Sequence, residues 1–105
     1  MRKIEQALQN AIVTKQPVWS TGNTSVTTHG SVTEVRLHGN KIAEVTDQWV
    51  RITDAGWRTA TTKSRLNAIL GCLFDGVTVF QESFEWFVSE QGVATPMGSE
   101  FLLQR

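Results

Sequence analysis

The segment EVRLHGNKIAEV, residues 34–45, decides the fold class because it has the pattern of two β-strands joined by a tight turn. In its first half Val35 and Leu37 alternate with charged residues, which is the period of a strand with one buried face. His38-Gly39-Asn40 then supplies residues that hairpin turns favour. A second strand is expected around Ile42–Val45, so the segment predicts an antiparallel hairpin.

The hairpin belongs to a longer β-rich region, residues 18–53, in which valine, threonine and isoleucine dominate. Val50 and Ile52 share one face of a further strand, and Trp49 and Arg51 share the other. Turn residues separate the strands at Gly22-Asn23, His29-Gly30, Gly39-Asn40 and Asp54-Ala55-Gly56. Short strands joined by regularly spaced turns predict an antiparallel β-meander.

Two helices are predicted outside the meander. One covers residues 2–14 and ends before Pro17, since proline disfavours helix in the residue before it. The other is expected to begin near Thr62, with Thr61 or Thr62 as its cap, and to end before Asp75-Gly76. The apolar stripes are Ile4, Ala7, Leu8, Ala11 and Ile12 in the first helix, and Leu66, Ile69, Leu70 and Leu73 in the second. This helical spacing is typical of helices with one buried face.

The C-terminal third returns to a period of two between Val77 and Val88. Because both faces of this run are apolar, it is predicted to be one strand, central in the sheet or covered by a helix. On such a strand Glu82 and Glu85 would point to opposite faces and could not act as a carboxylate pair. The tail after Ser89 is expected to be a loop with at most one short final strand.

Together these patterns predict an α+β fold in a single domain, residues 1–105: an N-terminal helix, an antiparallel β-meander, a second helix packed on the sheet, and C-terminal strands. Apolar residues make up 40% and charged residues 19% of the chain, as in globular proteins. Cys72 is the only cysteine, which excludes an internal disulfide and fits a reducing cytoplasm. No apolar run is long enough to predict a membrane span or a signal peptide.

Residues that catalysis and metal binding require are scarce. The sequence has two histidines, no tyrosine and one cysteine, and it lacks a phosphate-cradling glycine loop and the HExxH and GxSxG motifs. His29 and His38 are expected in turns or at strand edges, and Cys72 is expected to be an inert, partly buried thiol. We therefore predict no catalytic residue, metal or cofactor, and a protein that is not an enzyme.

Charge is unevenly distributed, although lysine plus arginine equals aspartate plus glutamate at ten each. Residues 55–74 contain only basic charged residues, and residues 75–104 contain only acidic ones. The two regions could face each other and cancel, or they could form separate patches. The sequence leaves both arrangements open.

The basic region contains the most distinctive segment, GWRTATTKSRLNAIL, residues 56–70. A helix start near Thr62 would place cations and hydroxyls beside free backbone amides, which is the chemistry of a phosphate site, and an indole ahead of it could stack on a base. The candidate residues are Trp57, Arg58, Thr61, Thr62, Lys63, Ser64 and Arg65. The alternative is a capped surface helix or a protein-contact face, with a tryptophan that closes the core.

The sequence has four tryptophans, and most of them are expected in the core because they bury a large area. Trp49 is the one expected to be exposed, since it shares a strand face with Arg51, opposite the apolar pair. An exposed tryptophan beside arginine is typical of a binding surface. The alternative is that a helix covers this face.

The strings VRLHGNKIAEV, residues 35–45, and GWRTATTKSRLNAIL, residues 56–70, are followed by EWFV, residues 85–88. This combination resembles a recurrent set of small bacteriophage proteins of unknown function. The resemblance covers residues 23–88 and leaves out the N-terminal helix and the tail. It implies a phage origin and expression in the bacterial host cytoplasm, and it implies no activity.

Three functions fit these observations. The favoured one is a protein that binds a host enzyme or defence complex and inhibits or modulates it, with Glu82 and Glu85 in an acidic strand that meets a basic host surface. The second is a nucleic-acid-binding accessory protein that uses the segment from Trp57 to Arg65. The third is a self-associating module, such as a dimer joined through an exposed sheet edge.

Overall fold

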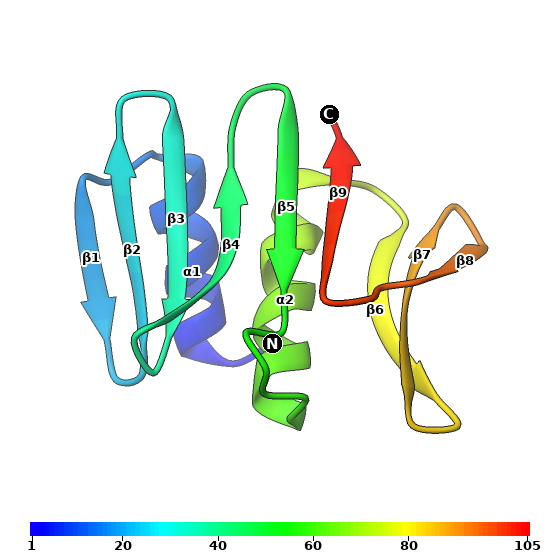
Figure 1. Cartoon of the computed structure of the whole chain (residues 1–105). Helices are drawn as coiled ribbons and strands as arrows, with labels where there is room; N and C mark the ends of the chain where they lie inside the picture. The colour runs from blue at the N-terminus through cyan, green and yellow to red at the C-terminus, as the bar shows by residue number, and fades with distance from the viewer.

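The computed structural model describes all residues, 1–105, and confirms the predicted α+β class. In chain order its elements are α1 (Lys3–Val13), β1 (Val18–Thr21), β2 (Thr24–His29), β3 (Val32–Leu37), β4 (Asn40–Val45), β5 (Trp49–Thr53), α2 (Ala60–Leu73), β6 (Val77–Glu82), β7 (Glu85–Glu90), β8 (Val93–Pro96) and β9 (Glu100–Gln104). A six-stranded sheet has both helices behind it, and a three-stranded sheet lies to its side (Figure 1). Neither helix is long and apolar enough to cross a membrane.

The larger sheet consists of the predicted meander and one strand from the end of the chain. Its order is β1-β2-β3-β4-β5-β9, and all neighbouring strands are antiparallel. The turn between β3 and β4 is His38-Gly39, with φ angles of 51° and 80°, as in the type I′ turns that suit twisted hairpins. β9 pairs with β5, so the chain end covers a strand edge that the meander alone would leave open.

The core lies between the larger sheet and the two helices, and the predicted apolar stripes of both helices face it. α1 contributes Leu8, Ala11 and Ile12, α2 contributes Leu66, Ile69 and Leu70, and the sheet contributes Val26, Val35, Leu37, Val50 and Ile52. Burying each larger aliphatic side chain stabilises the fold by roughly 1.5–3 kcal/mol. The helices therefore occupy one face of this sheet, and its other face stays open.

A β-bulge between β3 and β4 changes what the hairpin presents on that core face. The register shifts between Val35 and Arg36, so that Val35 opposes Ala43 while Arg36 opposes Lys41. Ile42 is the extra residue, and Ile42 and Ala43 are both buried although they are adjacent in the chain. The bulge therefore adds a second apolar side chain near the start of α2.

The start of α2 differs from the prediction. The helix begins at Ala60, and its cap is Thr59 rather than Thr61 or Thr62, with the Thr59 hydroxyl accepting from the Thr62 amide at 3.1 Å. The Lys63 amide already donates to the Thr59 carbonyl. The expectation that Lys63 and the two residues after it lie in the first turn is therefore wrong. Several threonines follow one another here and each can cap, so the local sequence does not single one out.

The single strand predicted for Val77 to Val88 is also wrong, because the run is a hairpin of β6 and β7. Ser83 and Phe84 form its turn with φ angles of 50° and 67°. A phenylalanine at positive φ is unfavourable, and the run contains none of the glycine, asparagine or proline residues from which a turn is usually predicted. As a consequence Glu82 and Glu85 lie directly opposite each other and share one face, which corrects their predicted separation.

The hairpin and β8 form the smaller sheet, in the order β6-β7-β8. One of its faces packs on the core through Val77, Val79, Trp86 and Val88. The tail therefore contains two strands where at most one was expected: β9, which matches the predicted final strand, and β8, which was predicted as loop. The four residues of β8 are all exposed, so they lack the burial pattern from which a strand is recognised.

Candidate functional site

Arg65, one of the cations expected to contact phosphate, is buried where three parts of the fold meet. Its Nη1 donates to Glu5 Oε2 at 2.9 Å, and its Nε and Nη2 donate to Thr24 Oγ1 and Asn23 Oδ1 at 3.0 and 3.2 Å. The Ser64 hydroxyl donates to the same Glu5 oxygen. Arg65 therefore links α1, α2 and the β1–β2 turn, and its side chain is 4% exposed.

Glu5 is the matching buried anion of α1. Burial alone would raise the pKa of Glu5, but the hydrogen bonds from Ser64 and Arg65 outweigh this effect and hold its pKa below the ordinary 4.5. The ion pair is thus satisfied on both sides, and removing one partner would leave a charge buried without compensation. Ser64 and Arg65 serve the fold, and neither is free to bind a ligand.

The remaining cations of the basic segment gather over one buried indole. The Arg58 guanidinium lies 5.7 Å from the centre of the Trp86 ring, and the Lys63 ammonium lies 5.9 Å from it. Arg58 also forms a 2.8 Å ion pair with Asp54, and Lys63 reaches the amide oxygen of Gln81 at 3.5 Å. Both cations therefore contact residues of the C-terminal region, but neither forms a salt bridge with one of its carboxylates.

The carboxylates of the acidic region, residues 75–104, form no salt bridges. All of them are exposed: Asp75, Glu82, Glu85, Glu90 and Glu100. The two oppositely charged regions thus do not cancel, which settles what the sequence left open. The negative charges remain available to a partner, whereas most of the positive ones do not.

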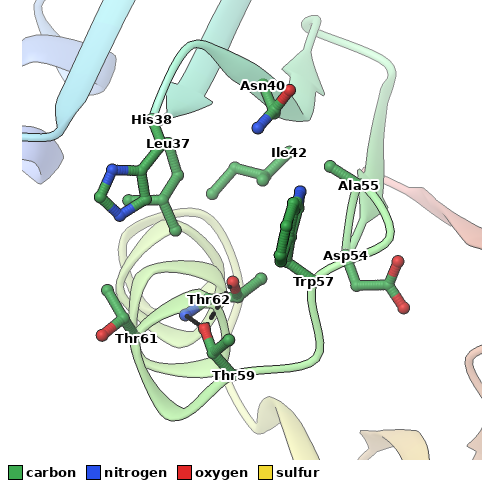
Figure 2. A pocket seen from close by; sticks show the side chains of 10 residues that line it. All are labelled: Leu37, His38, Asn40, Ile42, Asp54, Ala55, Trp57, Thr59, Thr61 and Thr62. Carbon is green, nitrogen blue, oxygen red and sulfur yellow. Dashed lines mark hydrogen bonds between the residues drawn. The ribbon is translucent and has the colours of Figure 1, made fainter.

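Three sequence-predicted residues of the basic segment line a pocket of about 560 Å³ at the start of α2: Trp57, Thr61 and Thr62. Figure 2 shows Trp57 on one side of this pocket and His38 on the other, with Leu37 and Ile42 between them. Trp57 is 63% exposed, so it is Trp57 rather than Trp49 that is the exposed tryptophan.

Trp49 and Arg51 lie on the open face of the larger sheet, as predicted, and no helix covers them. The Arg51 guanidinium sits 5.2 Å from the Trp49 ring centre and pairs with Glu44 at 2.7 Å. The same face carries a ladder of paired charges formed by Glu34, Arg36, Lys41, Glu44 and Arg51. The hydrogen bond from Arg36 is the largest cause of a lowered Glu34 pKa, and that to Glu44 is the largest cause of a raised Lys41 pKa. Every charged group of this ladder is therefore paired within it, and Trp49 is half-buried.

The open face of the smaller sheet has a different character. Phe80 and Phe87 stack there with ring centres 5.4 Å apart, and neither packs against the core. Glu82 and Glu85 face outward beside them, and Phe84 projects from the turn with 90% of its surface exposed. We call these five residues the acidic aromatic surface.

Comparison with known proteins gives the chain a family. Residues 1–103 match the family described as Kyanoviridae Gp96 protein, which is a family of phage proteins. The chain belongs to this family. No curated protein and no solved structure matches it. The match confirms the resemblance to small phage proteins and extends it beyond residues 23–88 to α1 and the C-terminal strands.

Phe84 is the most exposed large apolar side chain of this Gp96 family member, and the sequence does not single it out. The sequence predicts one apolar position within a continuous strand here, whereas the turn geometry shows that Phe84 points into solvent. One signal was present: the acidic residues Glu82 and Glu85 bracket it closely in the chain. The pocket residues His38 and Asn40 are likewise absent from the predicted site.

Other reactive groups of the chain form no further site. Burial raises the pKa of the Cys72 thiol, so the nucleophilic thiolate form is disfavoured. No group of three histidine, cysteine, aspartate or glutamate side chains lies close enough to hold a metal ion.

Proposed function

We propose that this phage protein acts by binding a protein of the bacterial host, in the host cytoplasm, and that it inhibits or modulates a host enzyme or defence complex without catalysing a reaction. The proposal rests on Phe84. A phenylalanine that is 90% exposed at a φ of 67° contributes nothing to the core and strains the backbone by roughly 1–2 kcal/mol. Such a residue is costly for folding, which favours a role in recognition.

The surroundings of Phe84 define the chemistry of the partner. Aromatic side chains that fill a pocket on the partner are typical hot spots of interfaces, and the stacked Phe80 and Phe87 extend the apolar area behind the tip. Glu82 and Glu85 carry unpaired negative charge on either side of it. The complementary surface is therefore an apolar pocket with a basic rim, and steering by opposite charge would speed association.

The two alternative functions have less support. Nucleic-acid binding through the segment from Trp57 to Arg65 would need cations, and those of the segment are engaged by Glu5, Asp54 and Trp86. Self-association through an exposed sheet edge, such as β1 or β8, would leave the exposed Phe84 without a role.

The test is capture of partners from host lysate by the tagged full-length chain, followed by purification of the partner and measurement of binding between the two proteins. Phe84→Asn should abolish the complex without lowering the free energy of unfolding, because asparagine tolerates a positive φ. Leu102→Asn is the matched control, since Leu102 is an exposed apolar residue of the larger sheet and should retain binding.

The effect of the acidic residues gives an independent readout. The double variant Glu82→Gln/Glu85→Gln should slow association and reduce its dependence on salt, as expected for rim charges. A partner that binds the Phe84→Asn variant as tightly as the natural chain would refute the proposal, and so would a lysate that yields no stoichiometric partner.

A further inference from the structure

A second surface, separate from the acidic aromatic surface and independent of the proposed function, is the pocket beside Trp57. We propose that it binds a planar, uncharged heterocyclic ring, the chemical class to which nucleobases belong. Its volume of about 560 Å³ lies within the range of pockets that hold small ligands.

The walls of the pocket suit a flat ring. Trp57 presents an exposed indole on one side, and the imidazole of His38 stands across the opening (Figure 2). Leu37 and Ile42 form an apolar floor, and Ile42 is directed there by the β-bulge. A ring that enters between the two aromatic side chains can stack on the indole and exclude water from the floor.

Polar groups at the rim can recognise the edge of such a ring. The side chains of His38, Asn40 and Thr61 line the pocket, and none of them forms a hydrogen bond within the protein. An amide, a hydroxyl and an imidazole offer both donors and acceptors. Nucleobases carry both on their edges, whereas a purely apolar ring would leave these groups without partners.

The electrostatics of the pocket favour an uncharged ring over a phosphate. Its one carboxylate, Asp54, points away in Figure 2 and is engaged by Arg58 and the Gly56 amide. Arg58 and Lys63 are directed to the Trp86 ring and do not line the pocket. Neither Arg58 nor Lys63 is therefore available in the pocket to pair with a phosphate. We expect the ring itself, rather than an attached phosphate, to be recognised.

The test is a two-dimensional NMR titration of the full chain with adenosine and uridine, with adenosine 5′-monophosphate, and with a short single-stranded oligonucleotide. We expect shifts of the Trp57 indole N–H, the Asn40 side-chain amide and the Thr61 amide at millimolar nucleoside. The monophosphate should bind no more tightly than adenosine, and affinity should depend weakly on salt. Trp57→Ala should lower the affinity by about tenfold or more, whereas Trp49→Ala should leave it unchanged.

A second variant guards against a folding artefact. Thr61→Phe fills the pocket from the half-buried first turn of α2 and should also block binding. If a nucleoside binds as tightly as the oligonucleotide, the natural ligand is a free small molecule. If the oligonucleotide binds more tightly, the natural ligand is a base within a strand. Absence of shifts overturns the proposal, as do shifts that persist in Trp57→Ala or binding of the monophosphate alone.

Discussion

Residues 55–74 and residues 75–104 carry charges of opposite sign, and the fold treats them differently. In the first region Arg58 and Arg65 form ion pairs with Asp54 and Glu5, which lie outside the acidic region. In the second region every carboxylate is exposed and without a salt bridge. The sequence shows the same kind of charge cluster twice, yet one cluster stabilises the fold and the other is free for a partner.

The comparison teaches that a charge cluster indicates a binding surface only if no other part of the chain neutralises it. In the first region Arg65 and Glu5 are both buried and pair with each other, and Arg58 pairs with the buried Asp54 of the β5–α2 loop, because buried charges need partners. Three of the five acids lie on the β6–β7 hairpin at the side of the molecule (Figure 1): Glu82, Glu85 and Glu90. All five are exposed to water, which screens them, so that no partner is required. Substitutions in the two regions should therefore differ in kind.

The largest effect is expected at Arg65. Arg65→Ala should lower the free energy of unfolding by about 3–5 kcal/mol, because it leaves Glu5 buried and unpaired. Lys63→Ala, two residues away on the same helix, should cost less than about 0.5 kcal/mol. Urea denaturation of both variants measures the difference. If both variants lose the same free energy of unfolding, the buried Glu5–Arg65 pair contributes no more to stability than the partly exposed Lys63.

A smaller effect is expected from pH through Glu5. Its folded pKa lies below the ordinary 4.5, so the unfolded chain takes up a proton first as the pH falls. The contribution of Glu5 is complete above pH 4.5 and is lost as the pH drops toward the folded pKa, with a slope of up to about 1.4 kcal/mol per pH unit.

Unfolding measured as a function of pH checks this in variants. Glu5→Gln should flatten the acid limb of the stability profile, although Glu34, whose pKa is also lowered, keeps part of it. Glu82→Gln, which removes a carboxylate outside the Glu5–Arg65 pair, is the control for the change in net charge. A slope that Glu5→Gln does not change would remove Glu5 from the acid response.

The smallest effect is expected within the β6–β7 hairpin. Glu85→Lys places a cation opposite Glu82 and should raise the free energy of unfolding by about 0.2–1 kcal/mol. Glu90→Lys makes the same charge change opposite Val77 and Val93, and should alter stability by less than about 0.5 kcal/mol. Thermal unfolding of the two variants compares them. If both gain equally, net charge rather than the cross-strand pair is responsible.

Most of the fold could be predicted because its signals are local. The helical spacing of Leu8 and Leu66 with their neighbours identified both helices, and the alternation around Val35 and Val50 identified the meander. The β6–β7 turn escaped because Ser83 and Phe84 adopt left-handed backbone angles that neither residue type prefers. Of the candidate site, Trp57, Thr61 and Thr62 lie in a pocket, whereas Phe84 was missed for the same reason as the turn.

The sequence by itself determined the α+β class, the order of the main elements and the separation of charge along the chain, because periodicity and composition act over a few residues. Tertiary structure alone decided which charges remain free. Arg65 meets Glu5 across 60 residues, and β9 returns to β5 after the whole smaller sheet has formed. Such contacts depend on how the elements pack, and a one-dimensional pattern carries no record of which distant side chains come together.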